Sequence, residues 1–432
     1  MICSRAVLAA AFAAAFSFLA PALPARAQQP AVAKAAAPAP LRVGDTPQWR
    51  AIVSPARPLP QPRAALVALG RQLFADTRLS QPQGTSCASC HDPGQGFTSF
   101  NGGRDGVAQG AVRGRLGTRN PPTLLYARYI PALYFYQDDD AQQPAPFGGL
   151  FLDGRADSFA EQVREPLMAR HEMNNATPAG VARQLRAAGY REAFEAQFGV
   201  GVLNDPKRAL QAAGDSLAAF LQSDELSPFS SRFDDMLRGK STLTTQELRG
   251  LAVFRNPDQG NCASCHTVNV TSSLPARSLF TDFGYEALAV PRNRKLPSNA
   301  DARAYDLGLC KTAEKRHWPE PESWCGYFRT PSLRNVAVRS RFMHNGAIDT
   351  LRDAVKFYAT RSVRPQDWYP QGKPFDDMPA AMQGNVNIAS TPLNRKPGMT
   401  PALSDEQIDD LVAFLRTLTD QRYEPLLASQ KR

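Results

Sequence analysis

The chain has 432 residues, and its 50 Lys and Arg outnumber its 40 Asp and Glu, which gives a formal net charge of +10. This length allows more than one hydrophobic core. The basic residues form no stripe with interleaved aromatic side chains, which argues against nucleic acid binding, and there is no stretch of about 18 apolar residues that would span a membrane.

Residues 1–27 have the pattern of a secretory signal peptide. Arg5 supplies the charged start, residues 7–19 form a short apolar run, and the small residues at 25 and 27 suit cleavage before Gln28. The apolar run is too short to remain in a membrane as a stable span. We therefore predict export to the periplasm and a mature chain that begins near Gln28.

After the signal peptide, the sequence predicts a tether followed by a helical protein. Residues 28–62 are rich in Ala, Pro and Gln without periodicity, which is typical of an extended tether. Apolar spacing predicts a helix over residues 64–74, and Thr244 with Glu247 forms a capping box for a helix over 244–254. Further helices are predicted over residues 158–168, 178–188, 191–198, 206–223, 350–358 and 404–419. Segments rich in Gly, Pro, Asn and Asp predict long loops over residues 97–122, 271–297 and 363–401. The fold class is therefore mainly α.

One five-residue motif, Cys-Ala-Ser-Cys-His, occurs twice, at residues 87–91 and 262–266. Two thiols separated by two residues can bond both vinyl groups of one porphyrin, and the imidazole that follows can bind its iron. Zinc ribbons and redox-active CxxC motifs are the alternatives. Paired zinc knuckles, however, lie about 15–20 residues apart, whereas these copies are far more distant and both end in His. We therefore predict two covalent haem c groups, attached through Cys87, Cys90, Cys262 and Cys265, with His91 and His266 as proximal iron ligands.

Two cysteines remain once the motifs are assigned. Cys3 precedes the apolar run and leaves with the signal peptide, so that Cys310 and Cys325 are left over. In an oxidising compartment two such thiols are expected to form a disulfide. The alternative is a pair of buried free thiols, which fits less well because residues 311–324 between them are too polar to resemble core.

Several separated phrases accompany the two motifs. They are, in chain order, residues 69–74 (LGRQLF), 153–156 (DGRA), 172–173 (EM), 330–335 (TPSLRN), 342–346 (FMHNG) and 414–418 (FLRTL). With these phrases the sequence from about residue 63 to 420 resembles the bacterial di-haem cytochrome c peroxidases and MauG. The resemblance implies two cytochrome-c-like haem domains with long connecting loops, which we place at residues 63–235 and 236–425 before a tail at 426–432. It also implies that the N-terminal haem reacts with peroxide, while the C-terminal haem stores or relays electrons.

The five histidines constrain the iron ligands. His91 and His266 are used beneath the irons, which leaves His171, His317 and His344 as further candidates. No His lies between His91 and His171, where members of the family that need reductive activation carry a removable distal His. We therefore predict an N-terminal haem that is open to peroxide. The alternative is that His171 reaches this iron, whereas His317 is expected at the surface.

The resemblance also implies residues for peroxide cleavage. Glu172 matches the distal glutamate of the family, which moves a proton between the two peroxide oxygens. Gln162 and Pro166 match helix positions that line the same pocket. The alternative for Glu172 is a purely structural pairing with a neighbouring Arg such as Arg170.

At the second haem, Tyr358 occupies the position where the peroxidases supply a Met sulfur. A phenolate oxygen favours oxidised iron, so that this haem could hold an oxidising equivalent, as in the MauG-type subgroup. The alternative is that Tyr358 is an ordinary helix aromatic and that Met343 or another Met binds the iron. His344 is then expected to hydrogen-bond a propionate or the ligand network.

Two features depart from the family. Leu152 stands before the Asp-Gly-Arg phrase, where the family has a Trp that relays electrons between the haems. The family also binds calcium between the haems, which here would use the side chain of Asn120 and the backbone carbonyls of Arg339 and Arg341. The positive charge of these arginines disfavours a hard cation, but their carbonyls remain available, and we therefore still predict one bound calcium ion.

These observations predict a periplasmic peroxidase that reduces hydrogen peroxide to water at the N-terminal haem. Electrons would come through the C-terminal haem from a small cytochrome c or cupredoxin. One alternative is a MauG-like enzyme that uses peroxide to oxidise side chains of a partner protein. A second alternative is an electron carrier with both irons capped, against which the absence of a distal His argues. A homodimer is an open option for its assembly.

Overall fold

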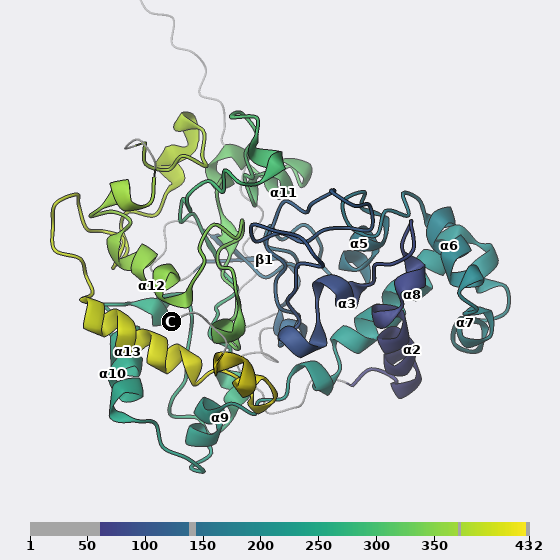
Figure 1. Cartoon of the computed structure of the whole chain (residues 1–432), viewed down its shortest axis with the longest axis horizontal. Helices are drawn as coiled ribbons and strands as arrows, with labels where there is room; N and C mark the ends of the chain where they lie inside the picture. Colours follow the sequence, from purple (N-terminus) through teal and green to yellow (C-terminus); the bar gives the residue numbers. More distant parts are fainter. Residues whose placement is uncertain (1–60, 138–143, 370–372, 429–432) are drawn as a thin grey trace, which may run out of the picture. The chain divides into compact units, whose positions relative to one another are not determined.

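The structure is a computed structural model that describes residues 61–137, 144–369 and 373–428. These residues all belong to one compact unit. Helices account for most of its regular structure (Figure 1), which confirms the mainly α class. The predicted signal peptide, and all of the predicted tether except its last two residues, lie outside the described residues.

The regular elements before residue 230 are mostly short helices. The α-helices are α2 (Ala64–Ala75), α3 (Cys87–Cys90), α4 (Phe159–Gln162), α5 (Arg164–Met168), α6 (Pro178–Ala187), α7 (Arg191–Phe198) and α8 (Pro206–Leu221). The 3-10 helices are η2 (Thr77–Leu79), η3 (Pro93–Gln95), η4 (Ala127–Tyr129), η5 (Val202–Asn204) and η6 (Asp224–Leu226). Strand β1 (Tyr134–Tyr136) pairs antiparallel with β2 (Ala145–Phe147), and Tyr134 lies opposite Phe147.

The second part of the chain is also built mostly from short helices. Its α-helices are α9 (Arg232–Leu237), α10 (Thr245–Arg255), α11 (Cys310–Lys315), α12 (Leu351–Thr360) and α13 (Asp405–Arg416). Its 3-10 helices are η7 (Cys262–Ser264), η8 (Pro275–Arg277), η9 (Pro297–Asn299), η10 (Pro321–Trp324), η11 (Val336–Val338), η12 (Pro365–Asp367), η14 (Ala380–Asn385) and η15 (Gln421–Ala428). Strand β3 (Tyr285–Glu286) pairs antiparallel with β4 (Phe328–Arg329).

A helix precedes each CxxCH motif, and each of these helices packs through a glycine. In α2, a Cβ added to Gly70 would lie 1.9 Å from the carbonyl oxygen of Ser216 in α8. In α10, a Cβ added to Gly250 would lie 2.0 Å from the carbonyl oxygen of Asp410 in α13. Both pairs are visible side by side in Figure 1. Since only glycine allows backbones to approach so closely, this packing depends on one residue type in each helix.

Most predicted helices are present within a few residues of their expected ends, and the capping box of Thr244 with Glu247 is formed. The helix predicted over residues 158–168 is instead divided into α4 and α5. Pro166 lacks the N–H that a continuous helix would direct at the carbonyl of Gln162, which explains the break. The prediction did not include α9 or α11. Within the described residues, the three predicted loops contain no α-helix.

Two large hydrophobic clusters form the core. The first is built mainly from α2 to α8, with fully buried rings at Phe194 and Phe220. The second contains Phe254 and Phe414, whose ring centres lie 5.3 Å apart at an angle of 62°, an edge-to-face contact worth about 0.5–1.5 kcal/mol beyond its buried area. Phe233, the first member of the second cluster along the chain, lies close to the predicted domain boundary at residue 235. The division into two haem domains stays a prediction.

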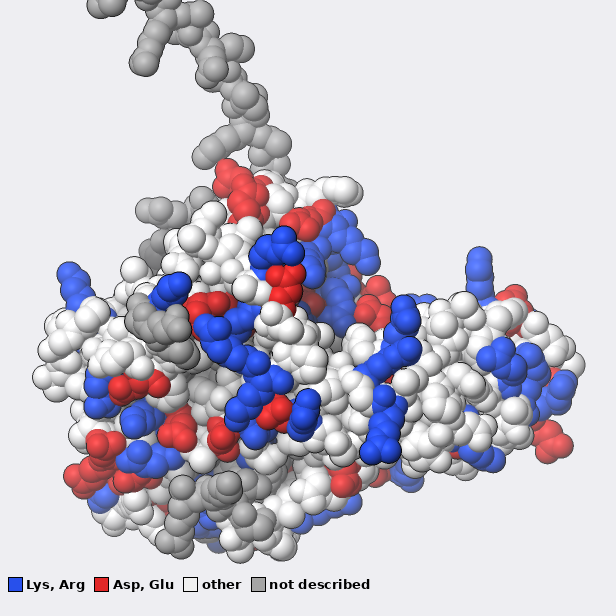
Figure 2. All heavy atoms as spheres, turned by 45° about the horizontal axis from the view of Figure 1, so that its top comes forward, with Lys and Arg blue, Asp and Glu red and all other residues white. Residues whose placement is uncertain are grey.

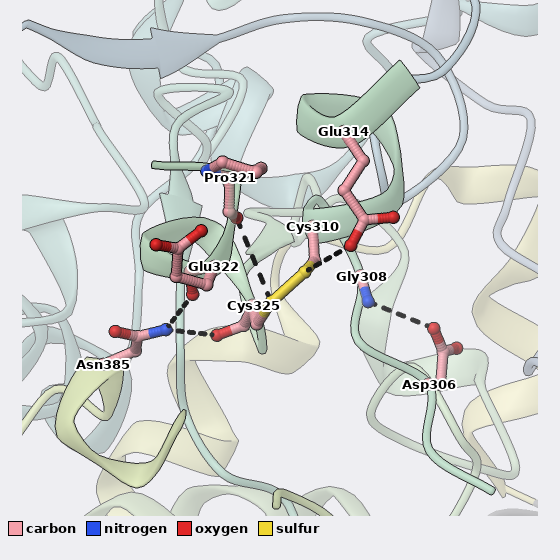
Figure 3. Close-up of a disulfide and its surroundings, with 8 residues drawn as sticks. All are labelled: Asp306, Gly308, Cys310, Glu314, Pro321, Glu322, Cys325 and Asn385. Carbon is pink, nitrogen blue, oxygen red and sulfur yellow. Dashed lines mark hydrogen bonds between the residues drawn. A yellow bond between two sulfur atoms is a disulfide. The ribbon is translucent and has the colours of Figure 1, made fainter. Parts of the chain in front are cut away.

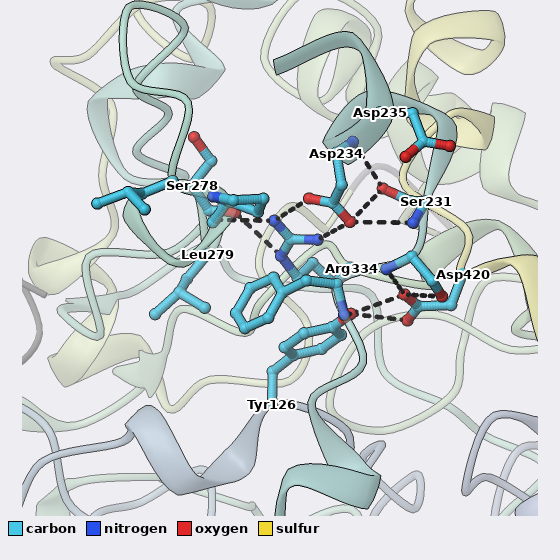
Figure 4. A network of polar contacts seen from close by, with 12 residues as sticks. Tyr126, Ser231, Asp234, Asp235, Ser278, Leu279, Arg334 and Asp420 are labelled. Carbon is cyan, nitrogen blue, oxygen red and sulfur yellow. Dashed lines mark hydrogen bonds and ion pairs between the residues drawn. The ribbon is translucent and has the colours of Figure 1, made fainter. Parts of the chain in front are cut away.

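A buried polar network joins segments from both clusters (Figure 4). The Arg334 guanidinium donates to both Asp234 oxygens, at 3.0 and 2.9 Å, and neither side chain is exposed. The Tyr126 hydroxyl lies 2.8 Å from each oxygen of Asp420. Asn335 donates to the same carboxylate at 2.6 Å. The network therefore connects the segment after the first CxxCH motif with the end of the chain.

The surface carries charges of both signs. Figure 2 shows Lys and Arg side chains spread over one face, with Asp or Glu side chains beside many of them. Exposed ion pairs of this kind, such as Arg303 with Asp301 at 3.2 Å, contribute little stability. Among the described residues, no helix combines the length and the apolar character that crossing a bilayer requires.

Candidate active site

The first CxxCH motif forms a single helical turn that ends at its histidine. Ser86 and Ser89 form a capping box at the start of α3, and the His91 N–H donates to the carbonyl of Cys87 at 2.8 Å. The His91 ring Nδ1 lies 3.2 Å from the carbonyl oxygen of Phe97. As Nδ1 donates to this carbonyl, Nε2 keeps its lone pair, which is the arrangement typical of metal-bound histidines.

The second motif has the same arrangement although it forms a 3-10 turn. The His266 N–H donates to the carbonyl of Cys262 at 2.8 Å, and its Nδ1 lies 2.9 Å from the carbonyl oxygen of Phe280. Burial lowers the pKa of both His91 and His266 to about 4. Both imidazoles are therefore neutral near pH 7, as an iron ligand must be.

The four motif cysteines are free thiols, and burial is the main cause that raises the pKa of each to about 12. Each motif thus presents two protonated thiols beside one neutral imidazole. Among the described residues, no cluster of three or more His, Cys, Asp and Glu side chains is arranged to hold a metal ion. The residues of both motifs fit a covalently attached haem c.

A cavity of about 320 Å³ lies against the second motif, within the size range of cofactor pockets. Its wall includes Cys262, Cys265 and His266, together with Tyr358 from α12. Many of the other lining side chains are aliphatic, among them Leu333, Leu351, Val355, Leu411 and Leu415, although charged residues such as Glu286 and Arg329 line it as well. This wall suits a flat apolar macrocycle whose iron lies near the imidazole.

Three candidate iron ligands line this cavity besides His266: Tyr358, Met343 and His344. Burial, and then the neighbouring Cys265 and Cys262, raise the pKa of the Tyr358 phenol well above its usual value. Among the described residues, no side chain or carbonyl hydrogen-bonds its hydroxyl. The His344 Nε2 is also buried without a partner, and its ring stacks on Phe328 with centres 3.8 Å apart.

Glu172 lies near the first motif. Its backbone is held by two hydrogen bonds, from its N–H to the carbonyl of Ala169 at 3.0 Å and from the N–H of Ala111 to its carbonyl at 2.7 Å. After burial, the charge of Glu172 is the next cause that raises the pKa of the Cys90 thiol. Burial also raises the pKa of Glu172 itself. The Glu172 carboxyl group is therefore close enough to the first haem attachment point to act on its thiols electrostatically.

The alternative partner for Glu172, Arg170, makes no ion pair with it in the described part of the chain. The nearby Arg155 pairs instead with Asp153 at 2.8 Å and with Glu165 at 2.9 Å. Glu172 thus makes no ion pair in the described part of the chain, although the nearby His171 and Arg155 act to lower its pKa against the larger effect of burial.

The other predicted pocket residues precede Glu172 along the chain. Gln162 ends α4 and Pro166 lies in α5, and both are half-buried. The N–H of Met173 donates to the carbonyl of Pro166 at 3.1 Å, which holds Pro166 close to Glu172 in the fold. Within the described residues, the side-chain amide of Gln162 makes no hydrogen bond. The side chains of His171 and His317 are both exposed.

Leu152, which replaces the Trp of the family, lines the cavity at the second motif. Close to it in sequence, Asp153 accepts a hydrogen bond from Arg119 at 2.7 Å, and Arg119 also forks onto Asp306 at 2.6 and 2.7 Å. Burial by itself would raise the pKa of Asp306, but the bonds and charge of Arg119 lower it well below its usual value. Sequence reasoning missed this pair, because Arg119 and Asp306 are 187 residues apart and neither belongs to a motif.

The residues predicted to bind calcium do come together, but as hydrogen-bond partners. The Asn120 Nδ2 donates to the carbonyls of Arg341 at 3.0 Å and Met343 at 3.2 Å. The Arg339 guanidinium donates to the carbonyls of Pro121 at 3.0 Å and Arg341 at 3.4 Å. With N–H groups directed at these oxygens, the arrangement does not fit a calcium ion.

Cys310 and Cys325 are joined by a disulfide, with Cα atoms 4.3 Å apart and both residues buried (Figure 3). Cys310 begins α11, and Cys325 directly follows η10. The Asn385 amide donates to the carbonyls of Glu322 at 2.8 Å and Cys325 at 3.1 Å. The disulfide and Asn385 together hold the loop that leads to β4 and the cavity wall.

Several known proteins are similar to this chain in sequence. The sequence model of a family described as di-haem cytochrome c peroxidase matches residues 64–242. The methylamine utilization protein MauG of Paracoccus denitrificans is 39% identical over 379 residues, which cover 85% of this chain and 92% of that protein. The cytochrome c551 peroxidase of Pseudomonas aeruginosa is 29% identical over 360 residues, or 82% of this chain and 78% of that protein.

A solved structure is similar as well. The crystal structure of the diheme peroxidase BthA from Burkholderia thailandensis matches with a TM-score of 0.83 and 55% sequence identity, covering 86% of this chain and 90% of that one. The chain therefore belongs to the family of di-haem cytochrome c peroxidases and MauG, which are oxidoreductases with two haems. Relatives with both names match it, so that membership alone leaves its particular reaction open.

Proposed function

We propose that the protein is a periplasmic di-haem peroxidase that reduces hydrogen peroxide to water. The observation that carries the proposal is the half-buried carboxyl group of Glu172, which has a raised pKa, lies near the first CxxCH motif and has no ion-pair partner in the described part of the chain. Electrons would come from a small cytochrome c or cupredoxin through the second haem site. Each hydrophobic cluster would support one haem domain, at residues 63–235 and 236–425.

Cys87, Cys90 and His91 would hold a haem at the first site. Its iron would supply the redox chemistry and an open position for peroxide. The chain's own contribution there is proton transfer. Because burial raises the pKa of Glu172 above its ordinary value of 4.5, this carboxyl group is a better proton acceptor than an exposed one and can return the proton near neutral pH. It takes the proton from one peroxide oxygen and gives it to the other, which leaves as water. Two electrons and two further protons complete the reduction to a second water.

Gln162 and Pro166 would shape the pocket in which this transfer takes place. The Gln162 amide, which has no hydrogen-bond partner among the described residues, could orient peroxide. Pro166 breaks the helix between α4 and α5, and the carbonyl of Pro166 fixes Met173 beside Glu172. The position of the catalytic carboxyl group thus depends on a local helix break.

Glu172→Gln tests the proposal in the protein with both haems attached. Gln keeps the shape of the side chain but cannot accept the proton, so that the bimolecular rate of reaction with peroxide should fall by about 10²–10⁴-fold. Glu161→Gln is the matched control, because Glu161 is an exposed carboxylate on α4 that accepts only the N–H of Asp157. Stopped-flow absorbance would follow both variants. An unchanged rate for Glu172→Gln would return this residue to a structural role.

At the second site we propose that Tyr358 would bind the iron of the haem that Cys262, Cys265 and His266 would hold. The support is its place on the cavity wall and its hydroxyl, which no described residue hydrogen-bonds. Tyr358→Phe should therefore change the spin state of one haem in the electron paramagnetic resonance spectrum. Tyr369→Phe is the control, since this buried hydroxyl donates to the carbonyl of Ala289. A change in Met343→Leu with none in Tyr358→Phe would assign the ligand to Met343 instead.

A second candidate function is the peroxide-driven oxidation of side chains in a partner protein. It is favoured by the same Tyr358, because an anionic oxygen ligand stabilises oxidised iron and would let the enzyme hold oxidising equivalents. The two functions differ in how the peroxide-treated protein behaves without a donor. A long-lived oxidised state that Tyr358→Phe shortens favours the modifying enzyme, whereas rapid turnover with a reduced cytochrome favours the peroxidase. Two six-coordinate low-spin haems whose spectrum does not change when peroxide is added would indicate a simple electron carrier.

A further inference from the structure

The contacts of Arg339 stand out between the two haem segments. Its side chain reaches Pro121, next to Asn120, through the 3.0 Å hydrogen bond from Nη2, and it reaches Arg341 through Nε at 3.4 Å. Arg339 also lines the cavity at the second motif. A single guanidinium thus links the segment that follows the first motif to the wall of the cavity at the second motif.

Arg339 has no acidic partner among the described residues. Its neighbour Arg341 is different, since the Arg341 guanidinium pairs with Asp349 and only its carbonyl faces Asn120. The groups around the Arg339 side chain are therefore backbone carbonyls, which are the ligands that a hard cation would use. The guanidinium satisfies these oxygens with its own N–H groups.

A calcium ion would require a different arrangement. Calcium takes about 6–8 oxygen ligands at about 2.3–2.6 Å and gains most of its affinity from carboxylates. Here the Asn120 side chain presents N–H groups to the carbonyls of Arg341 and Met343, and the Arg339 guanidinium donates to the same Arg341 carbonyl and to that of Pro121. The ion would have to displace the guanidinium and then remain beside it.

We propose that the Arg339 guanidinium is the built-in cation of this protein, in the place where related proteins use calcium, and that it holds residues 120–121 against residues 341–343 without a metal ion. This inference does not depend on the proposed peroxidase activity. The cation is then a side chain of the protein itself, so that chelators and changes in calcium concentration do not affect the connection between the two haem segments.

Metal analysis of the protein with both haems attached is the first test. After exchange into metal-free buffer, it should contain less than about 0.1 calcium per chain, and titration with calcium chloride up to 1 mM should produce no binding heat. A chelator should leave the thermal midpoint and the haem resonance spectrum unchanged. One calcium per chain that survives the exchange, or a midpoint that the chelator lowers, would overturn the proposal.

Variants supply the second test, and none of its readouts requires turnover of peroxide. Arg339→Ala should lower the thermal midpoint by about 2–4 °C, because buried carbonyls lose charged hydrogen-bond donors, and it should shift the haem resonances. Arg341→Ala keeps the backbone carbonyl and removes only an exposed ion pair, so that it should behave like the unaltered protein. Equal midpoints and spectra for the two variants would refute the role of Arg339. If Arg339→Ala does not fold, the calcium content of the unaltered protein decides.

Discussion

The buried pair of Asp234 and Arg334 allows a quantitative prediction. Asp234→Asn keeps the size of the side chain but removes the charge that faces a guanidinium with no exposed surface. The remaining partners of the Arg334 side chain are the carbonyls of Ser278 and Pro275, both at 3.0 Å (Figure 4), and three aromatic rings, and none of these groups carries a negative charge that would neutralise it; the rings are those of Tyr126, Phe229 and Phe280. The Asn amide would also direct one N–H towards the guanidinium.

The expected cost follows from the burial of the pair. Removing one partner of a buried ion pair destabilises a protein by about 3–5 kcal/mol, because the other charge stays buried and unpaired. For the roughly 360 residues that the structure describes, an unfolding entropy of about 2.1 cal/mol/K per residue makes 1 kcal/mol equal to about 1.3 °C. Asp234→Asn should therefore lower the thermal midpoint by about 4–6 °C, measured by circular dichroism at a fixed scan rate on the protein with both haems.

Asp235→Asn is the matched control for this experiment. Asp235 follows Asp234 in α9, but its side chain is 43% exposed and pairs only loosely with Arg238 at 3.7 Å. An exposed pair of this kind contributes up to about 1 kcal/mol, so that the control should shift the midpoint by less than about 1.5 °C. If both variants shift it equally, the desolvated charge is not what makes Asp234 important, and the reasoning from burial fails.

Three further predictions concern the pH dependence, the disulfide and the cofactors. The folded-state pKa of Glu172 lies above 4.5, so that the rate of reaction with peroxide should fall as pH drops through that pKa, and Glu172→Gln should lose this titration; a profile that is the same in both would contradict the assignment. In unfolded, unreduced protein, thiol labelling should find neither Cys310 nor Cys325 reactive, and reaction at either one would exclude the disulfide. The mass of the denatured mature protein should correspond to a chain that begins near Gln28 with two haems. A mass with one haem or none would contradict the prediction that each CxxCH motif binds a haem covalently.

The local features of this protein follow from its sequence. Haem attachment depends on five consecutive residues, so that both motifs could be recognised without any knowledge of the fold. Helices with clear caps, such as the one that begins at Thr244, were predicted nearly to the residue because a capping box involves neighbours along the chain. The division of α4 from α5 was missed, although Pro166 is visible in the sequence, because the apolar spacing of that segment continues across the break.

The relations between distant residues were decided only by the tertiary structure. The ion pair of Arg119 with Asp306 spans 187 residues, and nothing in either local sequence indicates the partner. The raised pKa of Glu172 is a consequence of burial, which depends on packing around the whole side chain. The sequence named Asn120, Arg339 and Arg341 as a group, but it could not tell whether the Arg341 carbonyl faces an ion or a guanidinium. That choice depends on where one long, flexible side chain points once the chain has folded, and no pattern along the sequence encodes this direction.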